Sequence, residues 1–464
     1  MVLNALFIIN EFYWLLFLPV VIIVFLLALF SLDKLMFLII FLTPLSIQVE
    51  KLDFGIGVAL PTEPLMFGVM ILFFIKLFYE KKIDYKVFNH PVTITVILSL
   101  LWTFITSVTS EMPLVSFKFL ISKLWFIVCF YFIGIQLFKN YSNIKKFFWA
   151  YMIPLTMVII YTIAHHSLFN FEHKPAHWVM TPFFNDHTSY GAILVMFFPV
   201  LFLFFKNKYS NTVRLLVTMV FLIFILGILL SYTRAAWISL IVAFGLFLVY
   251  IFRIKFRTLL AVFALLLGLF FTLKSEIVMK LEKNRQESSN DISEHVQSIS
   301  NITSDASNLE RINRWEAALR MFKERPVFGW GPGTYSFLYA PFQLSKEKTI
   351  ISTNAGNMGN AHSEYIGPLA EQGLIGSLLF LFILISVYYR GTKLYFRLTD
   401  KESKQIVLVV LLGLTTYFVH GVLNNFLDTD KASVPFWGFI AILTAIDIYH
   451  RESEDVKTFN TTCN

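Results

Sequence analysis

Long apolar runs separated by short polar connections dominate the chain. Thirteen of these runs are long enough to cross about 30 Å of hydrocarbon as an α-helix. They cover residues 12–30, 34–49, 64–79, 91–109, 120–138, 147–164, 188–205, 213–231, 235–252, 257–273, 372–389, 405–420 and 433–449. Only residues 31–34 separate the first two runs, so twelve spans result if these two form one tight hairpin. The pattern therefore predicts an all-α, polytopic membrane bundle of about 12–13 transmembrane helices.

The connections between the runs alternate between rich and poor in Lys and Arg. Five connections (76–90, 139–146, 206–214, 253–257 and 390–404) together hold 18 of these cations. The five short connections between them hold one each, namely Lys51, Lys118, Lys174, Arg234 and Lys431. Cations concentrate in the cytoplasmic loops of membrane proteins, so we expect the first set on the cytoplasmic side. The orientation of the N-terminus stays open, because its charges are few.

This alternation divides the chain into four parts. N-terminal transmembrane helices occupy 1–273, one large extracytoplasmic loop 274–371, C-terminal transmembrane helices 372–450 and a cytoplasmic tail 451–464. In the loop, residues 284–308 are rich in Ser, Asn, Asp and Glu, and we expect them to be mobile or partly disordered. Residues 307–324 then predict an amphipathic helix, with apolar side chains at helical spacing: Leu309, Ile312, Trp315, Leu319 and Phe322. Pro326 ends this helix, and glycines at 329, 331 and 333 predict turns.

The composition supports a membrane protein and argues against other classes. The 464 residues are 57% hydrophobic and only 15% charged, whereas soluble domains carry roughly 25% charged residues. The net charge of +8 does not indicate nucleic-acid binding, because the cations lie in short clusters between apolar runs. The two cysteines, Cys129 in an apolar run and Cys463 near the C-terminus, argue against a structural disulfide. We interpret the first apolar run as a retained helix, since it lacks the basic start and cleavage site of a secretory signal.

Charged residues at the edge of a membrane bundle are costly, which makes them functional candidates. Arg234 lies in a very short outer turn, where a guanidinium suits bidentate binding of a phosphate. Arg311 and Arg314 lie on neighbouring faces of the predicted loop helix. The structural alternatives are a cation that reaches the lipid headgroups for Arg234, and a solvated helix face for the other two.

His362 lies at the end of the large loop, just before a membrane helix. An imidazole with its ordinary pKa near 6.5 accepts a proton at neutral pH, which makes His362 a candidate general base. The alternative is a structural or exposed histidine. Glu364, two residues further on, is a possible substrate-binding residue.

Asp186 and His187 close another outer connection and are candidate substrate-binding residues. The same connection holds four more histidines: His165, His166, His173 and His177. Their spacing matches no standard zinc or iron motif, so we predict no metal site and no cofactor. Three polar residues in the last outer connection carry a weaker signal still: His420, Asn424 and Asn425.

Three fragments, in this order, resemble motifs of the O-antigen ligase/polymerase superfamily of bacterial envelope glycosyltransferases. They are residues 231–237, residues 311–337 and residues 360–376. The first half of the chain agrees with that family only in being a series of membrane helices. The family's arginine in a short outer turn matches Arg234, its arginine four residues before a Trp matches Arg311, and its histidine before a Glu-x-Gly helix matches His362.

The resemblance implies an activity as well as a fold. Members of this family take a glycan from undecaprenyl diphosphate and pass it to an acceptor on the periplasmic face of the inner membrane. In this chain Arg234 and Arg311 would then bind the donor diphosphate without a metal, and His362 would accept the proton of the acceptor hydroxyl. We favour an O-antigen ligase with lipid A core as acceptor slightly over a polymerase that extends a growing glycan, with a protein O-oligosaccharyltransferase as a further possibility.

A transporter or flippase of lipid-linked glycans is the alternative from another class. Such a protein usually carries charges and broken helices at the bilayer midplane. The notable charges of this chain cluster at one interface instead, beside a large loop, which favours an enzyme with a one-sided site.

Overall fold

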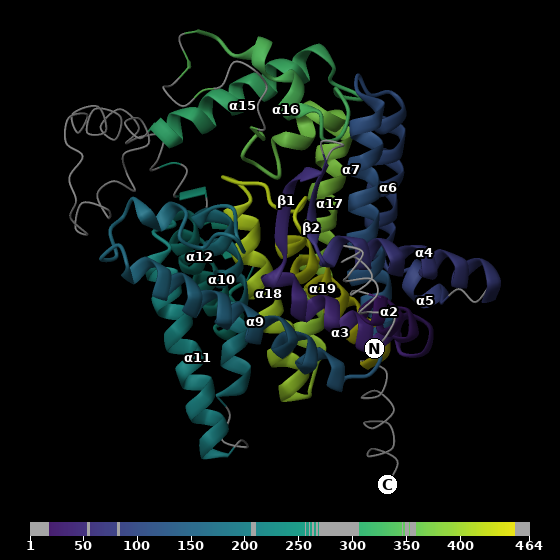
Figure 1. Cartoon of the computed structure of the whole chain (residues 1–464), viewed down its shortest axis with the longest axis vertical. Helices are drawn as coiled ribbons and strands as arrows, with labels where there is room; N and C mark the ends of the chain where they lie inside the picture. The colour runs from purple at the N-terminus through teal and green to yellow at the C-terminus, as the bar shows by residue number, and fades with distance from the viewer. Residues whose placement is uncertain are drawn as a thin grey trace, which may run out of the picture.

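The computed structural model describes residues 18–52, 56–80, 84–205, 210–255, some residues between 257 and 268, 306–345, 347–348, 352 and 359–450. The predicted mobile segment 284–308 and the tail 451–464 fall almost entirely outside these residues, as does most of the predicted span 257–273. Figure 1 shows a bundle of long helices with a short two-stranded hairpin among them. This arrangement confirms the all-α membrane fold.

Helices make up most of the described chain, with two short strands near its N-terminal end. In chain order these elements are α2 (Leu18–Phe30), α3 (Leu32–Leu42), β1 (Ile47–Leu52), β2 (Ile56–Leu60), α4 (Thr62–Glu80), α5 (Tyr85–Phe88), α6 (Pro91–Val108), α7 (Pro113–Ile127), α8 (Gly134–Leu137), α9 (Ser142–Ser167), α10 (His187–Leu201), α11 (Asn211–Leu230), α12 (Arg234–Ile251), α15 (Ala306–Glu324), α16 (Tyr335–Leu338), α17 (Gly367–Arg397), α18 (Lys401–His420) and α19 (Asp430–Ala445). A π-helical turn at Val128–Ile133 joins α7 to α8, and another at Ile446–His450 extends α19.

Ten helical segments of the described chain are long and apolar enough to cross a membrane. They coincide with ten of the thirteen predicted runs. The two remaining runs at the N-terminal end form shorter helices, because α2 has 13 described residues and α3 has 11.

The second predicted run, 34–49, ends earlier than expected. Helix α3 stops at Leu42, and the chain then enters an antiparallel hairpin in which Ile47 pairs with Leu60 and Val49 with Val58. Apolar and polar residues alternate in Ile-Gln-Val-Glu at 47–50, which is the period of a strand and not of a helix. The apolar run continues from the helix into the strand, so its length alone predicted one helix over 34–49.

The described helices divide into a buried centre and a periphery. In α10, α18 and α19, 72%, 78% and 89% of the residues in the most apolar stretch are buried, against 22% in α4, α11 and α12. Aromatic rings fill the centre: Tyr151 and Phe197 stack with ring centroids 4.4 Å apart, and Phe439 meets Phe148 edge to face at 5.8 Å. The centre therefore gives rigid support to whatever lies at the helix ends.

Connections predicted on the extracytoplasmic side meet at one end of the bundle, where α15 and α16 pack against α17 (Figure 1). Between α6 and α7, the N–H of Glu111 donates to the carbonyl of Trp330 (3.1 Å), and its carboxylate pairs with Arg325 (2.7 Å). Asn185, before α10, donates to Gln48 of β1 (2.6 Å). These contacts agree with the predicted alternation.

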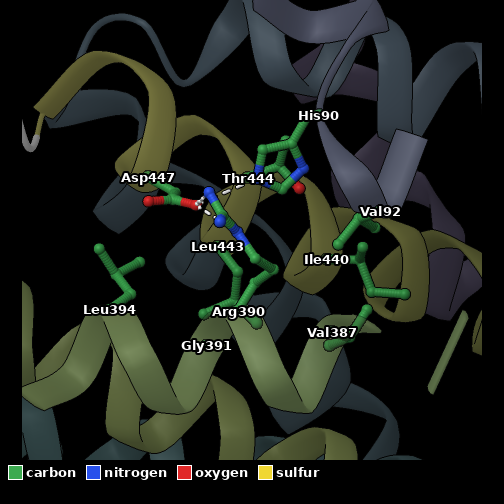
Figure 2. Close-up of a pocket in the computed structure, with 10 residues that line it drawn as sticks. All are labelled: His90, Val92, Val387, Arg390, Gly391, Leu394, Ile440, Leu443, Thr444 and Asp447. Atoms are coloured by element: carbon green, nitrogen blue, oxygen red, sulfur yellow. Dashed lines mark hydrogen bonds and ion pairs between the residues drawn. The ribbon is translucent and has the colours of Figure 1, made fainter. Parts of the chain in front are cut away.

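Connections predicted to be cytoplasmic meet in the same way at the opposite end. Asp84 pairs with Lys139 (3.1 Å), and Lys145 pairs with Glu402. Nearby, the Asp447 carboxylate contacts both His90 (3.1 Å) and Arg390 (2.6 Å) at the wall of a small pocket between α6, α17 and α19 (Figure 2). The two sets of loops therefore lie at two separate ends of the molecule.

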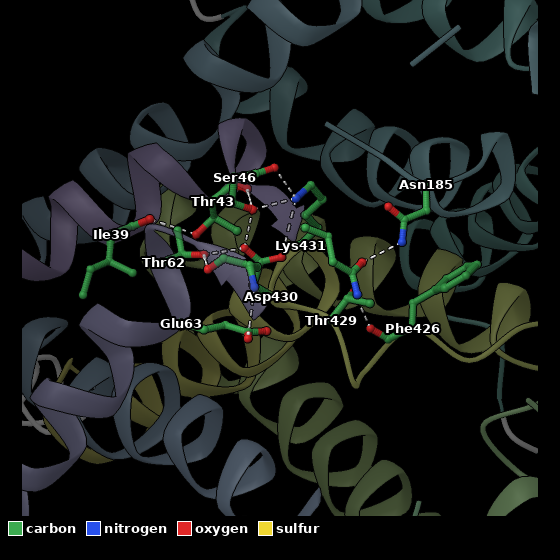
Figure 3. A network of polar contacts seen from close by, with 12 residues as sticks. Ile39, Thr43, Ser46, Thr62, Glu63, Asn185, Phe426, Thr429, Asp430 and Lys431 are labelled. Carbon is green, nitrogen blue, oxygen red and sulfur yellow. Dashed lines mark hydrogen bonds and ion pairs between the residues drawn. The ribbon is translucent and has the colours of Figure 1, made fainter. Parts of the chain in front are cut away.

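A buried polar network fastens α19 to the N-terminal elements (Figure 3). Asp430 accepts from the hydroxyls of Ser46 (2.5 Å) and Thr62 (2.7 Å), and Lys431 donates to the Ser46 carbonyl (2.9 Å). The pair is nearly inaccessible, with Asp430 2% and Lys431 9% exposed. Buried charges are tolerated when they are hydrogen-bonded in this way, so we assign this network a structural role.

Candidate active site

Helix α15, predicted at 307–324, is present at Ala306–Glu324, but it is oriented differently from the amphipathic expectation. The predicted apolar positions Ile312 and Leu319 are exposed, and the side chain of Leu309 lies outside the described residues. The buried face instead consists of Glu310, Asn313, Arg314, Ala317, Ala318 and Met321. The structural alternative of a solvated face does not hold for Arg314, because hydrogen bonds within the loop compensate for the burial of its charge. A contact of Arg314 with substrate stays a prediction.

Arg314 links the loop helix to the segment that leads into His362. Its Nε donates to Glu310 Oε1 (2.8 Å), and its Nη1 donates to the carbonyl of Asn360 (3.1 Å). Gly359 makes this approach possible, since a Cβ at that position would collide with Arg314 Nη1. Arg314 therefore holds the backbone two residues before the candidate base.

His362 has a left-handed backbone conformation, with φ of +48°, and its N–H donates to the Asn360 side chain (3.1 Å). A few per cent of non-glycine residues adopt this conformation, so the local turn holds His362 in a defined place. Burial lowers the pKa of the His362 imidazole to about 3, with further lowering by Arg314 and Arg311, while Asp186 and Glu310 act in the opposite sense. His362 is therefore neutral at pH 7 and lies within electrostatic range of both loop arginines and of Asp186.

Arg311 reaches a second element, the connection between α18 and α19. Its Nε donates to the carbonyl of Leu423 (3.2 Å), and the N–H of Leu423 donates in turn to the carbonyl of His420 (3.1 Å). One turn of α15 thus holds two separate segments, one through Arg311 and the other through Arg314. The two arginines bring the end of α18 and the backbone before His362 to the same helix.

The turn that begins α12 lies against the start of α10. Tyr232 has a φ of +49°, and the hydroxyl of Thr233 donates to the carbonyl of His187 (2.8 Å). This bond places the backbone of Arg234, the first residue of α12, beside the start of α10. Asp186 caps α10 by accepting from the N–H groups of Thr188 and Ser189 (2.7 and 2.8 Å). The structure therefore places the backbones of three predicted site residues close together: Asp186, His187 and Arg234.

The histidine-rich connection folds over the same turns. The rings of His177 and His187 lie 4.1 Å apart, and the rings of His173 and Tyr232 lie 5.0 Å apart. Within the described part of the chain, no group of three or more His, Cys, Asp or Glu side chains could hold a metal ion. These rings instead pack against the turn that precedes Arg234.

Glu364 has a structural environment that sequence reasoning did not reveal. Its Oε1 accepts from the Tyr417 hydroxyl (2.7 Å) and from the N–H groups of Phe426 and Leu427 (2.8 and 3.0 Å). Burial raises the pKa of the Glu364 carboxyl to about 7. These bonds fasten the α18–α19 connection to the segment that contains His362. A contact of Glu364 with substrate stays a prediction.

The glycine-rich segment after α15 packs backbone to backbone against a kink in α17. The N–H groups of Trp330 and Gly331 donate to the carbonyls of Ala370 (3.0 Å) and Glu371 (2.8 Å). At the kink, Gly373 has a φ of +67°, and a Cβ there would collide with the carbonyl oxygen of Val327. The two fixed residues of the Glu-x-Gly motif therefore have structural roles. The Glu371 carboxylate accepts from the N–H of Tyr335, just after the glycines (3.1 Å), and Gly373 leaves room for the Val327 carbonyl.

Comparison with known proteins gives this geometry a family context. Residues 219–381 match the sequence model of a family described as O-antigen ligase. The match confirms the resemblance to the O-antigen ligase/polymerase superfamily. An uncharacterised protein of Haemophilus influenzae is 26% identical over 305 residues, which are 64% of this chain and 72% of that protein. The chain is therefore a multi-pass membrane protein in which residues 219–381 are similar to the O-antigen ligase family.

The segment that matches the O-antigen ligase model contains most of the candidate site. It runs from within α11 to within α17 and includes Arg234, Arg311, Arg314, His362 and Glu364. Two elements of the site come from outside it. They are the start of α10, with Asp186 and His187, and the turn after α18.

Proposed function

We propose that this protein is a membrane glycosyltransferase that moves a glycan from undecaprenyl diphosphate to a hydroxyl of an acceptor. The observation that carries the proposal is the convergence of Arg311, Arg314 and His362 with the turns of Asp186 and Arg234 at one end of the bundle. Together these residues provide cations, a neutral imidazole and a carboxylate within one electrostatic neighbourhood.

The cations suit the leaving group of such a reaction. When the bond between the anomeric carbon and the diphosphate oxygen breaks, the bonding electrons remain on the diphosphate. Guanidinium groups stabilise this charge without a metal, and their planar shape suits two oxygens of one phosphate. In this proposal Arg311 and Arg234 bind the diphosphate, and Arg314 holds the loop that presents the base.

His362 suits the acceptor side of the reaction. The acceptor oxygen forms its bond to the anomeric carbon as the diphosphate leaves, and the hydroxyl proton passes to the imidazole. Burial, and then the charges of Arg314 and Arg311, oppose protonation of His362 in the free protein. A bound diphosphate offsets their charge, so the imidazole becomes a stronger base once the donor is in place. Direct attack from the opposite face inverts the anomeric configuration.

We place this site on the periplasmic side of the bacterial inner membrane, with lipid A core as acceptor in an O-antigen ligase. The positive-inside pattern of the connections supports the side, and the O-antigen ligase match supports the reaction class. A polymerase that extends a growing glycan uses the same donor chemistry. A flippase is less well supported, because the charges of the site gather at the helix ends and not at mid-membrane.

The test is the surface-glycan profile of a strain lacking this gene, separated on a gel and complemented with wild type or with His362→Ala at equal expression. Polymer that accumulates on the lipid carrier with none on lipid A core is expected for a ligase. Single repeat units alone would indicate the polymerase instead. Restoration of the normal profile by His362→Ala would contradict the role of His362, and an unchanged profile in the deletion strain would reject both assignments.

A further inference from the structure

The turn after α18 places a second buried histidine beside Arg311. The Leu423 carbonyl accepts from Arg311 Nε (3.2 Å), while the Leu423 N–H donates to the His420 carbonyl (3.1 Å). His420 ends α18, which packs against α10, and the cap and first residue of α10, Asp186 and His187, both act electrostatically on His420. The residue therefore borders both the loop helix and the turn of Asp186.

The ring of His420 has a defined tautomer. Its Nδ1 lies 3.3 Å from the Asn424 Nδ2, and an amide nitrogen can only donate. The Nδ1 atom is therefore the acceptor, and the proton of the neutral imidazole resides on Nε2. The side chain is 0% exposed, and this Nε2 has no hydrogen-bond partner among the residues that the structure describes. A buried donor without an acceptor is rare and requires an explanation.

Two further polar atoms near this turn share the same property. Within the described chain, Asn425 Oδ1 and His187 Nδ1 are buried without a hydrogen-bond partner. The charge of Arg311 acts on both His187 and His420, and that of Asp186 acts on His420 as well. Two histidines from two elements, His187 and His420, thus lie within electrostatic range of Arg311, each with a buried ring nitrogen that has no partner in the described chain.

We propose that His420 is a donor-binding residue whose Nε2–H hydrogen-bonds an oxygen of the substrate diphosphate, next to Arg311. This inference rests on the proposed function. A diphosphate oxygen is the favoured partner over a sugar hydroxyl, because hydrogen bonds to anionic acceptors are the strongest and Arg311 contacts the same turn. The two histidines of the site then have opposite tasks: His362 accepts a proton from the acceptor, whereas His420 donates a hydrogen bond to the leaving group.

The test measures binding of undecaprenyl diphosphate to the purified full-length protein in lipid nanodiscs. We expect His420→Phe to weaken binding about 10- to 100-fold, the value of one hydrogen bond to a charged group. His420→Gln, which keeps an N–H donor on a shorter chain, is expected to fall between wild type and His420→Phe. With undecaprenol, which lacks the phosphates, the wild type and the variants should bind alike.

His90→Phe is the matched control. His90 is 5% exposed and also has a ring nitrogen, Nδ1, without a partner in the described chain, but it lies beside Asp447 in the pocket at the end predicted to be cytoplasmic. Figure 2 shows His90 in this pocket. This variant should lower thermal stability without changing the dissociation constant for undecaprenyl diphosphate. A loss of affinity in His420→Phe that His90→Phe matches would therefore overturn the proposal.

Unchanged affinity in a folded His420→Phe protein would also overturn it. If that variant does not fold, Asn424→Leu decides, because loss of the amide allows the ring proton to move to Nδ1. Weaker binding in Asn424→Leu is expected, and wild-type affinity would refute the assignment of His420. Failure of the folded wild type to bind undecaprenyl diphosphate would reject the proposed function itself, which distinguishes the two failures.

Discussion

Substitutions at the buried pair of Glu310 and Arg314 can distinguish an effect on the stability of the loop from an effect on the position of His362. The two side chains are 4% and 9% exposed, and Arg314 Nε lies 2.8 Å from Glu310 Oε1. Removal of one member of such a pair leaves the other charge buried and costs about 3–5 kcal/mol. We therefore expect Glu310→Leu and Arg314→Leu each to lower the free energy of unfolding by about 3–5 kcal/mol.

The double variant Glu310→Leu/Arg314→Leu should be more stable than either single one. It removes both charges and fills their space with apolar side chains, which is often neutral or favourable. The lost bonds of Arg314 to the Asn360 carbonyl and of Glu310 to Ser352 reduce that gain. We expect a net loss of about 1–2 kcal/mol relative to wild type, well below the sum of the single variants.

Activity should not recover with stability. Arg314 Nη1 holds the Asn360 carbonyl, and this bond is absent from the double variant. A displacement of the base by about 1 Å costs up to about 100-fold in rate, so we expect kcat per folded molecule to fall by about 10- to 100-fold. The assay combines thermal unfolding in detergent with glycan transfer by the same preparations. Wild-type turnover in the double variant would refute the positioning role of Arg314, and additive losses of stability would refute the coupling of the pair.

The geometry leads to three more expectations. Burial and two arginines lower the pKa of His362 to about 3 in the free protein, whereas a bound diphosphate raises it. The acid limb of the pH profile should therefore lie at higher pH for kcat, which reports the donor-bound enzyme, than for kcat/KM, which reports the free enzyme. Coincident limbs would contradict this. Gly373→Ala should lower the free energy of unfolding by more than about 2 kcal/mol, because the new Cβ meets the Val327 carbonyl. Gly245→Ala is the control, since a Cβ there has no described atom within 4 Å, and equal melting temperatures of the two variants would refute the close packing at Gly373. Burial raises the pKa of Glu364 to about 7 in the folded protein, so its contribution to stability should decrease as pH rises from about 4.5 to 7. Glu364→Gln should therefore weaken the fall of stability over this range, and a variant with the wild-type slope would refute the contribution of Glu364.

The membrane helices could be predicted from the sequence, because crossing a bilayer requires a long apolar run whatever the neighbouring helices are. The grouping of the connections into two sets followed from their Lys and Arg residues, and the contacts of Glu111 with Trp330 and of Asp84 with Lys139 place each set at its own end of the bundle. The hairpin at residues 47–60 was missed, since its apolar residues continue the preceding run and only the change of period marks the strand.

The site was predictable in its residue types but not in its internal bonds. Arg311 and His362 were identifiable as charge and imidazole at an interface, and Arg314 as their neighbour. That Glu310, Asn313 and Arg314 form the buried face of α15 was not, because hydrophobic periodicity assigns burial to apolar residues alone. Likewise, Glu364 could be noticed as a carboxylate, but its bonds to Phe426 and Leu427 join residues 62 and 63 positions apart.

The decisive experiment uses the purified protein in liposomes, with an undecaprenyl diphosphate-linked glycan, a lipid A core acceptor and a metal chelator. Transfer of the glycan together with release of undecaprenyl diphosphate is expected for wild type, and both should fall to background in His362→Ala and Arg311→Ala at equal folded amounts. Undiminished transfer by either variant would contradict the assigned roles. Movement of the intact lipid-linked glycan across the membrane without any transfer would contradict the glycosyltransferase itself.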